Sequence, residues 1–413
     1  MPSLARSIQS LSGWRRTAVL ALAGAASVLA MAPFFAWPVL FVTLPILVWQ
    51  IDASRLAAPA VGETRWWHHP AMRAAAAGWW FGFGYFFAGL FWIGEAFLVE
   101  ADKFAVLIPF AVTLMPAGLA LFWAGATGLA ALAWAPGWGR IATLALTLSA
   151  AEWLRGHVLT GFPWNVLGYA LTWPLPLMQT AAFLGIYGLT LVAVPAFAAP
   201  AVLWADGGKR RGWGVMASAA VISVLVVAGA FRLASDDPPA DGSIRIRVVQ
   251  PSVPQREKWR PENQGRIFRD HLDLSTRSSS GAADGASGVA LIVWPEAAMP
   301  FLPLDTPDAL EAIGRLLPEG AHLAAGALRV EAPPAGRTRR RIFNSLMIFG
   351  QEGRLAGLYD KIHLVPFGEY LPFQSTLEAL GLEQLTRIRG GFDIGITPRP
   401  VLKVAGLPSM GPL

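Results

Sequence analysis

The hydrophobic pattern divides the chain into two parts of different character. Long apolar runs separated by short polar stretches fill residues 17–231, whereas residues 232–413 have the mixed composition of a soluble domain. Because a helix needs ~20 mostly apolar residues to cross a bilayer, we expect residues 1–231 to form a membrane domain with about seven transmembrane helices. The runs expected to form them are residues 17–32, 34–51, 74–98, 104–134, 140–155, 177–205 and 213–231.

The distribution of positive charge predicts the orientation of these helices. One set of connecting segments is rich in basic residues, namely Arg6, Arg15, Arg16, Arg55, Arg65, Arg73, Arg140, Lys209, Arg210 and Arg211. The opposite set carries only Lys103 and Arg155. Cytoplasmic loops hold the excess of Lys and Arg, so we expect a cytoplasmic N-terminus and a periplasmic second part, in the inner membrane of a bacterium. This accounts for the net charge of +6 without a nucleic-acid partner, for which the sequence shows no motif.

The second part alternates between strand and helix patterns. Residues Ile244–Val248 alternate in polarity with period two, which is typical of a strand. Helices are expected at Glu262–Ser275 and at Thr306–Leu317, where Thr306 is the predicted N-cap. Further strands are expected at Val289–Val293, His322–Val330, Arg341–Phe349 and Leu355–Tyr359. Strands alternating with helices favour a layered α/β domain over residues 232–413.

Candidate chemistry gathers in the segment Tyr359–Tyr370. It places Lys361 and Glu369 on either side of a mostly apolar stretch, and Glu296 ends an apolar run further upstream. A buried carboxylate and a buried lysine can act as base and anion stabiliser in acyl transfer. Each also has a structural interpretation: Glu296 could open a helix, Lys361 could be solvated, and Glu369 could pair with it. The 413 residues contain no cysteine, and therefore no thiol nucleophile and no disulfide.

Longer motifs resemble known families. Trp294-Pro295-Glu296, followed by Asp360-Lys361 and the segment 363–369, resembles the carbon–nitrogen hydrolase (nitrilase) superfamily. Other motifs resemble the apolipoprotein N-acyltransferases within it: Arg155-Gly156, Thr160–Trp164, Gly168-Tyr169, Gln250–Gln255, Lys258-Trp259 and Phe343-Asn344-Ser345. The resemblance implies a multi-pass α-helical membrane domain followed by a periplasmic nitrilase-like αββα sandwich.

The resemblance also implies site residues. Glu296 would be the general base, Lys361 would stabilise the oxyanion, and Glu369 would assist them. The substrate-binding residues implied are Trp259, Asn344 and Phe367. Because a carboxylate in an apolar pocket has a raised pKa, we expect this of Glu296.

The implied reaction moves a fatty acyl chain in two steps through a cysteine thioester. The donor would be a membrane phospholipid, and the acceptor the N-terminal amine of a diacylglyceryl-cysteine lipoprotein. No cofactor and no metal are implied, and we expect a monomer in the bilayer. The family's cysteine is expected just beyond residue 413, so residues 232–413 would form the N-terminal part of a catalytic domain that is incomplete at its C-terminus.

Several alternatives remain open. A membrane-tethered amidase of the nitrilase type would share Glu296 and Lys361, and an inactive truncated remnant would need neither. Residues 152–169 could form an aromatic belt with a re-entrant turn, which composition favours, or a docking surface for lipid headgroups. The apolar stretch Leu364–Phe373 could form a lid that dips into the membrane or could cover the α/β core.

Overall fold

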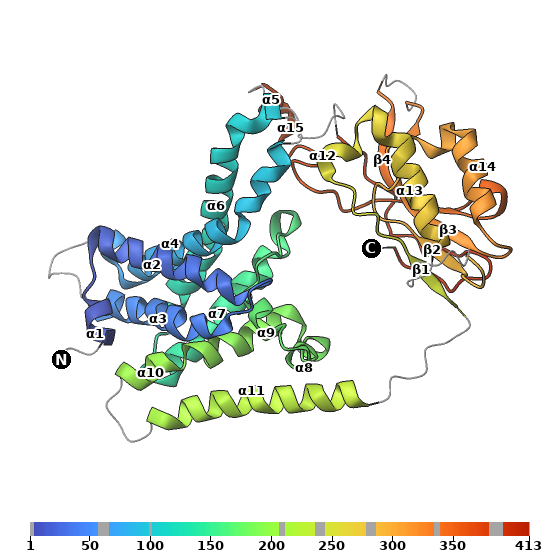
Figure 1. Cartoon of the computed structure of the whole chain (residues 1–413). Helices are drawn as coiled ribbons and strands as arrows, with labels where there is room; N and C mark the ends of the chain where they lie inside the picture. The colour runs from blue at the N-terminus through green and yellow to red at the C-terminus, as the bar shows by residue number, and fades with distance from the viewer. Residues whose placement is uncertain are drawn as a thin grey trace. The chain divides into compact units, whose positions relative to one another are not determined.

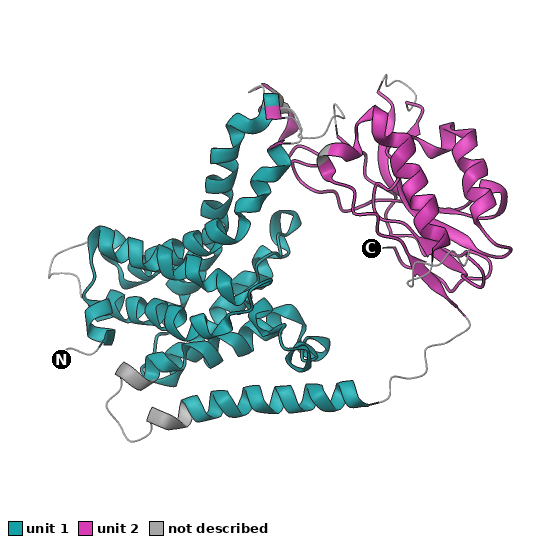
Figure 2. Ribbon diagram, in the orientation of Figure 1, with its two compact units in different colours: residues 1–97, 102–236 teal, residues 98–101, 237–413 magenta. Residues whose placement is uncertain are grey.

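The chain forms two compact units. The computed structural model describes residues 4–56, 66–98, 101–205, 211–235, 244–277, 286–333, 339–379 and 391–412. Unit 1 comprises residues 1–97 and 102–236, and unit 2 comprises residues 98–101 and 237–413 (Figure 2). The last helix of unit 1 continues to Ala234, past the boundary expected after residue 231.

The described residues of unit 1 are helical (Figure 1). Its longer helices are α2 Gly13–Ser27, α3 Leu40–Leu56, α4 Pro70–Leu90, α6 Ile108–Leu132, α7 Trp138–Arg155, α9 Ala181–Ala198 and α11 Arg211–Ala234. Shorter helices are α1 Leu4–Gln9, α5 Ala101–Phe104, α8 Leu175–Met178 and α10 Pro200–Ala205. Glycines let α2 and α4 approach closely, since a Cβ added at Gly24 would lie 1.9 Å from the Phe81 carbonyl oxygen.

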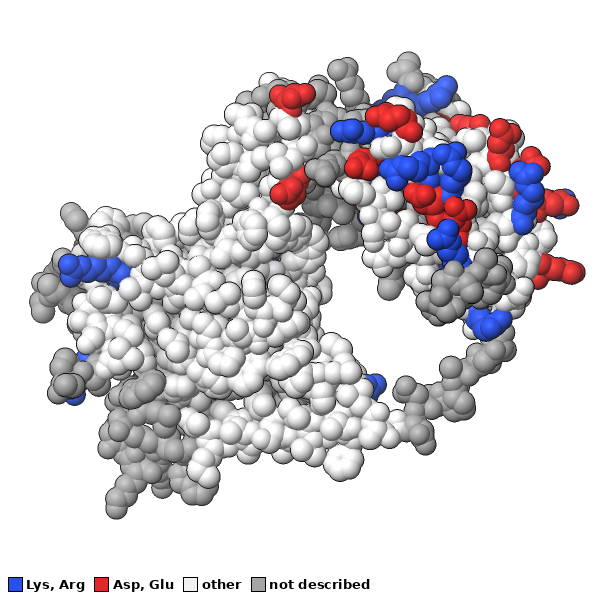
Figure 3. All heavy atoms as spheres, in the orientation of Figure 1, with Lys and Arg blue, Asp and Glu red and all other residues white. Residues whose placement is uncertain are grey.

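Within the described residues, five helical segments are long and apolar enough to cross a membrane. They are Trp37–Leu56, Pro70–Leu98, Ala105–Leu132, Ala181–Val202 and Val215–Ala234. The predicted spans 17–32 and 140–155 correspond to α2, which ends at Ser27, and to α7, which carries three charged residues. A total of seven spans therefore stays a prediction. The face of unit 1 drawn in Figure 3 shows few charged side chains, as a lipid-facing surface requires.

Unit 2 is built on a mixed five-stranded sheet in the order β1-β2-β3-β4-β5. The strands are β1 Ile246–Val248, β2 Leu291–Val293, β3 His322–Glu331, β4 Arg341–Phe349 and β5 Leu355–Asp360. The first three run parallel, and β4 lies antiparallel to both β3 and β5. The helices are α12 Gln255–Lys258, α13 Gln264–Thr276, α14 Pro307–Leu316 and α15 Gln374–Ala379. A helical membrane part followed by this mixed sheet confirms the predicted fold class.

The two faces of the sheet are covered differently. Alternate side chains of β2, β3 and β4 pack against α13 and α14, through Phe268 and Ile313. The intervening side chains pack against Leu402 and Val404 near the end of the chain. The described part of unit 2 thus shows one sheet with α13 and α14 on one face, and the second sheet of the expected αββα sandwich stays a prediction.

The predicted strands and helices of unit 2 are confirmed to within a few residues, with one local correction. Thr306 precedes α14 as expected, but its hydroxyl donates to the Leu302 carbonyl oxygen at 2.9 Å and does not cap the helix. The apolar segment predicted over Leu371–Leu385 contains α15, and its residues 380–385 lie outside the described residues.

Candidate active site

Glu296 is placed by a segment that continues along β3 after β2 ends. The backbone N–H of Gly326 donates to the Pro295 carbonyl oxygen, and that of Ala298 donates to the Gly326 carbonyl oxygen. A Cβ at Gly326 would lie 2.7 Å from the Glu296 Cα atom. Glycine is therefore required for Glu296 to lie this close to the strand.

Asn344 and Lys361 reach the same face of the sheet from β4 and from the end of β5. The backbone N–H of Lys361 donates to the Asn344 carbonyl oxygen at 2.8 Å. Since successive side chains of a strand point to opposite faces, both lie on the side away from α13 and α14. Glu296 joins them across Gly326.

Four side chains meet in one hydrogen-bonded cluster. The Lys361 ammonium donates to Oε1 of Glu296 and to Oε1 of Glu369, both at 3.1 Å. The Asn344 amide donates to the same two oxygens, at 2.6 and 2.7 Å. The structure therefore brings the three predicted catalytic residues together, and Asn344 and Lys361 each bridge the same two carboxylates.

Glu369 also shapes the loop that precedes it. Its second oxygen accepts a hydrogen bond from the Val365 backbone N–H at 2.7 Å, and its own N–H donates to the Val365 carbonyl oxygen. Phe367 lies at the tip of this loop with φ of 63°, a left-handed conformation that is uncommon for a bulky residue. Its side chain is 52% exposed. Glu369 thus links the position of Lys361 to an outward-facing apolar loop.

The electrostatics of the cluster correct one expectation. Burial alone would raise the pKa of Glu296, but hydrogen bonds from Asn344 and Lys361 and the charges of Lys361 and Lys258 hold it below its ordinary value. The expected raised pKa is therefore wrong, because the Glu296 side chain is 64% exposed and accepts hydrogen bonds from Asn344 and Lys361. Burial lowers the pKa of Lys361, yet the bonds and charges of Glu369 and Glu296 outweigh burial and raise it. At neutral pH Glu296 is therefore a carboxylate and Lys361 an ammonium.

Comparisons with known proteins agree with both parts of the chain. A family model described as the apolipoprotein N-acyltransferase N-terminal domain matches residues 23–199, and the carbon–nitrogen hydrolase model matches residues 245–406. The apolipoprotein N-acyltransferase of Rhodopseudomonas palustris is 47% identical over 97% of this chain and 73% of its own length. The chain belongs to the apolipoprotein N-acyltransferase family. Similar proteins of the same name from Bradyrhizobium diazoefficiens and Rhizobium meliloti are each 44% identical, over 97% and 98% of this chain and 73% and 75% of their own lengths.

Membership in this acyltransferase family gives the cluster its chemical context. The chain is a membrane protein of the carbon–nitrogen hydrolase superfamily, and Glu296, Lys361 and Glu369 form one polar cluster of unit 2. The described residues contain no group of three or more His, Asp or Glu side chains arranged to hold a metal ion.

Sequence reasoning missed Lys258 as a member of the site. Its ammonium donates to the backbone carbonyl oxygen of Glu296 at 3.3 Å. Burial lowers the pKa of Lys258, and the charge of Glu296 opposes this shift. The adjacent Trp259, predicted to bind substrate, is half-buried. The signal available in the sequence was the pairing of Lys258 with Trp259 in one motif.

The family motif in unit 1 is organised by a buried ion pair. Arg155 and Glu152 are fully buried, and their side chains bond at 2.8 Å. Arg155 also donates to the carbonyl oxygens of Phe162 and Trp164, which fixes the loop after α7. Its guanidinium therefore faces the protein interior and not a lipid headgroup, whereas Trp164 on the same loop is exposed.

Proposed function

We propose that this protein transfers a fatty acyl group from a membrane phospholipid to the N-terminal amine of a diacylglyceryl-cysteine lipoprotein. The observation that carries the proposal is the Glu296–Lys361–Glu369 cluster, in a chain whose other unit has helices able to span a membrane. Both substrates are anchored by acyl chains, so an enzyme acting on them gains from lying in the same bilayer.

The cluster suits Glu296 to the role of general base. Its bonds to Asn344 and Lys361 both use Oε1, and its side chain is largely exposed, so Oε2 is the oxygen that faces a reacting group. Its lowered pKa keeps it ionised at neutral pH. It can then take the proton of a thiol or of the attacking amine.

Lys361 would supply the positive charge that the reaction requires. An ammonium near a thiol favours the thiolate, and the same charge stabilises the tetrahedral oxyanion that follows. Glu369 also accepts a hydrogen bond from this ammonium at 3.1 Å. Asn344 would then orient the two carboxylates, while Trp259 and Phe367 would contact the acyl chains of the substrates.

The thiol of the proposed thioester is not among the 413 residues, which contain no cysteine. Its predicted position beyond residue 413 stays a prediction carried by the family resemblance. The assays proposed below therefore use the protein isolated from its native membrane.

The distribution of Lys and Arg supports a cytoplasmic N-terminus and a periplasmic unit 2 in the inner membrane of a bacterium. A Gln255→Cys variant tests this placement, because position 255 is exposed and a label there can be located by peptide mass spectrometry. We expect a membrane-impermeant thiol reagent added to spheroplasts to reach it. Labelling that requires lysis would reject the proposed orientation.

The deciding experiment measures acylation of a diacylated lipopeptide. Protein from its native membrane, in phospholipid vesicles, should increase the lipopeptide mass by one fatty acyl group. Glu296→Gln should slow this by about 10²–10⁴-fold, the range for loss of a general base. The exposed Glu311→Gln, paired with Arg315 on α14, is the matched control and should retain full activity. Hydrolysis of soluble amides without lipopeptide acylation would favour the amidase alternative.

A further inference from the structure

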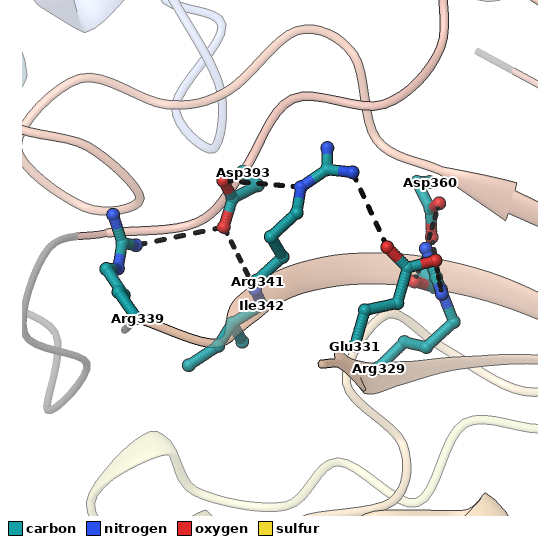
Figure 4. A network of polar contacts seen from close by, with 8 residues as sticks. Arg329, Glu331, Arg339, Arg341, Ile342, Asp360 and Asp393 are labelled. Carbon is teal, nitrogen blue, oxygen red and sulfur yellow. Dashed lines mark hydrogen bonds and ion pairs between the residues drawn. The ribbon is translucent and has the colours of Figure 1, made fainter. Parts of the chain in front are cut away.

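A second polar cluster lies on the opposite face of the sheet, directly behind Lys361. Arg329 of β3, Ser345 of β4 and Asp360 of β5 make up this rear cluster. Figure 4 shows Arg329 beside Asp360. Arg329 donates two hydrogen bonds to the Asp360 carboxylate, from Nε at 2.9 Å and from Nη2 at 2.6 Å. The Ser345 hydroxyl donates to the same carboxylate at 2.6 Å.

The register of the sheet explains why these side chains meet. Ser345 lies opposite Asp360 in the β4–β5 pair, and Arg329 lies opposite Phe343 in the β3–β4 pair. The side chains of the rear cluster, and that of Phe343, point to the face covered by α13 and α14. Ser345 and Asp360 are thus each one residue away from a member of the cluster of Glu296, Asn344, Lys361 and Glu369: Ser345 follows Asn344, and Asp360 precedes Lys361.

The rear cluster is sheltered enough to hold its geometry. The side chains of Arg329 and Asp360 are each only 11% exposed, and Ser345 is buried. The Arg329 guanidinium also lies over the ring of the buried Phe343, with 4.4 Å to its centroid. A bidentate arginine–carboxylate pair adds directional specificity as well as energy. The end of β5 is therefore fixed from behind at the residue before Lys361.

We propose that Arg329, through Asp360, is a positioning residue that sets where the Lys361 ammonium lies. Asp360 cannot move without moving the Lys361 backbone, to which it is directly bonded in the chain. That backbone has two further restraints, since the Lys361 N–H donates to Asn344 and the Gly395 N–H donates to the Lys361 carbonyl oxygen at 3.0 Å. The expected effect on acylation rests on the proposed function, whereas the positioning of Lys361 does not.

The chain offers a matched control in Arg341. This arginine lies over the same Phe343 ring at 4.6 Å and pairs with the same Glu331 as Arg329, at 3.4 Å. Its other ion pair is with Asp393 and not with Asp360 (Figure 4). Arg341→Met therefore removes a cation and a ring contact of the same kind while leaving the Arg329–Asp360 pair intact.

The test compares Arg329→Met with Arg341→Met in the protein isolated from its native membrane. The first readout is acetylation of Lys361 by acetic anhydride at mildly alkaline pH, followed by peptide mass spectrometry with the exposed Lys403 as internal reference. The neutral amine is the reactive form, and its fraction rises about tenfold when the pKa falls by one. Displacing Lys361 from its two carboxylates should lower its pKa, so we expect its acetylation to rise several-fold in Arg329→Met and to stay unchanged in Arg341→Met.

The second readout is lipopeptide acylation. A misplaced reacting group far from a mutation can cost about 10²-fold in rate, so we expect kcat to fall about 10- to 100-fold in Arg329→Met with KM little changed. Arg329→Lys keeps the positive charge but loses the bidentate bond to Asp360, so its kcat should lie between those of the wild type and Arg329→Met. It also serves in place of Arg329→Met if that variant does not fold.

The two readouts separate the inference from the proposed function. Unchanged Lys361 acetylation in folded Arg329→Met or Arg329→Lys would overturn the positioning role, even if acylation fell. Raised Lys361 acetylation in either variant would support the positioning role, even if the wild-type protein acylated no lipopeptide. That last result would reject the acyltransferase proposal and leave the positioning of Lys361 by Arg329 standing.

Discussion

Replacing Arg155 by Met tests how the buried ion pair supports unit 1. The substitution preserves much of the apolar stem of Arg155 but removes its charge and its bonds to Glu152, Phe162 and Trp164. Glu152 would keep the hydrogen bond from Trp123 at 2.7 Å, but its buried carboxylate would lose its countercharge. We expect the variant to lose stability and its loop to lose its fixed conformation.

The size of the loss follows from the burial. Both side chains are 0% exposed, which places the pair among buried ion pairs, whose breakage costs about 3–5 kcal/mol when one partner is removed. For a unit of this size, 1 kcal/mol corresponds to ~2–4 °C in Tm, so we expect Tm to fall by about 6–20 °C. The double variant Arg155→Met/Glu152→Gln removes both charges and should recover part of the loss.

The assay is thermal unfolding in detergent, followed by intrinsic tryptophan fluorescence. The control is Arg232→Met, which removes an exposed arginine that bonds Gln179 and lies over the Phe183 ring at 5.9 Å. Surface substitutions of this kind cost about 0.5 kcal/mol or less, so its Tm should change by about 2 °C at most. A Tm for Arg155→Met no lower than that of Arg232→Met would refute the idea that this pair holds α7 and the following loop.

Three further predictions concern unit 2. Gly395→Ala should lower the rate of lipopeptide acylation about tenfold or more, because the added Cβ would lie 2.1 Å from the Asp360 carbonyl oxygen and would displace the segment that restrains Lys361. The control is Gly411→Ala, whose Cβ would meet no atom within 4 Å and which should leave the rate unchanged. The pKa of Lys361 is raised by folding, so its charge stabilises the fold fully below its ordinary pKa of 10.5, and this contribution is lost as pH rises through the pKa of the folded state. The Tm difference between the wild type and Lys361→Met should therefore shrink as pH rises above 10.5. A Tm difference that stays constant would contradict the assignment. Phe367→Ser should reduce lipopeptide use while leaving Tm nearly unchanged, since the side chain is 52% exposed; a large fall in Tm would show instead that Phe367 covers the core.

The sequence predicted the elements of unit 2 well because their patterns are local. Period-two alternation identified β1, and the apolar runs before Trp294 and around Ser345 identified β2 and β4. Thr306 shows the limit of such reasoning: its position before α14 was right, but its hydroxyl found the Leu302 carbonyl oxygen instead. The partner of a hydroxyl depends on backbone geometry that residue type alone does not specify.

The candidate site was accessible to sequence reasoning only in part. The structure brings Glu296, Lys361 and Glu369 together, and their catalytic roles stay predictions. Arg329 escaped notice because its bond to Asp360 depends on the registers of two strand pairs, β3–β4 and β4–β5. The lowered pKa of Glu296 was missed for a related reason, since it depends on hydrogen bonds from Asn344 and Lys361 and on nearby charges that the fold brings close.

Glu369 connects the Lys361 ammonium to the apolar loop that carries Phe367, and under the proposed function it would couple substrate contact to chemistry. One of its oxygens holds Lys361 and Asn344, and the other holds the Val365 N–H at the base of the apolar loop. The left-handed Phe367 at the tip of that loop costs free energy that the loop's own hydrogen bonds must offset. A force that moves Phe367, such as an acyl chain packing against it, acts on the same carboxylate that holds the Lys361 ammonium. The cluster around Lys361 is therefore restrained from two directions, by Arg329 from behind the sheet and by Glu369 from the loop, and only the loop carries an exposed apolar side chain, Phe367.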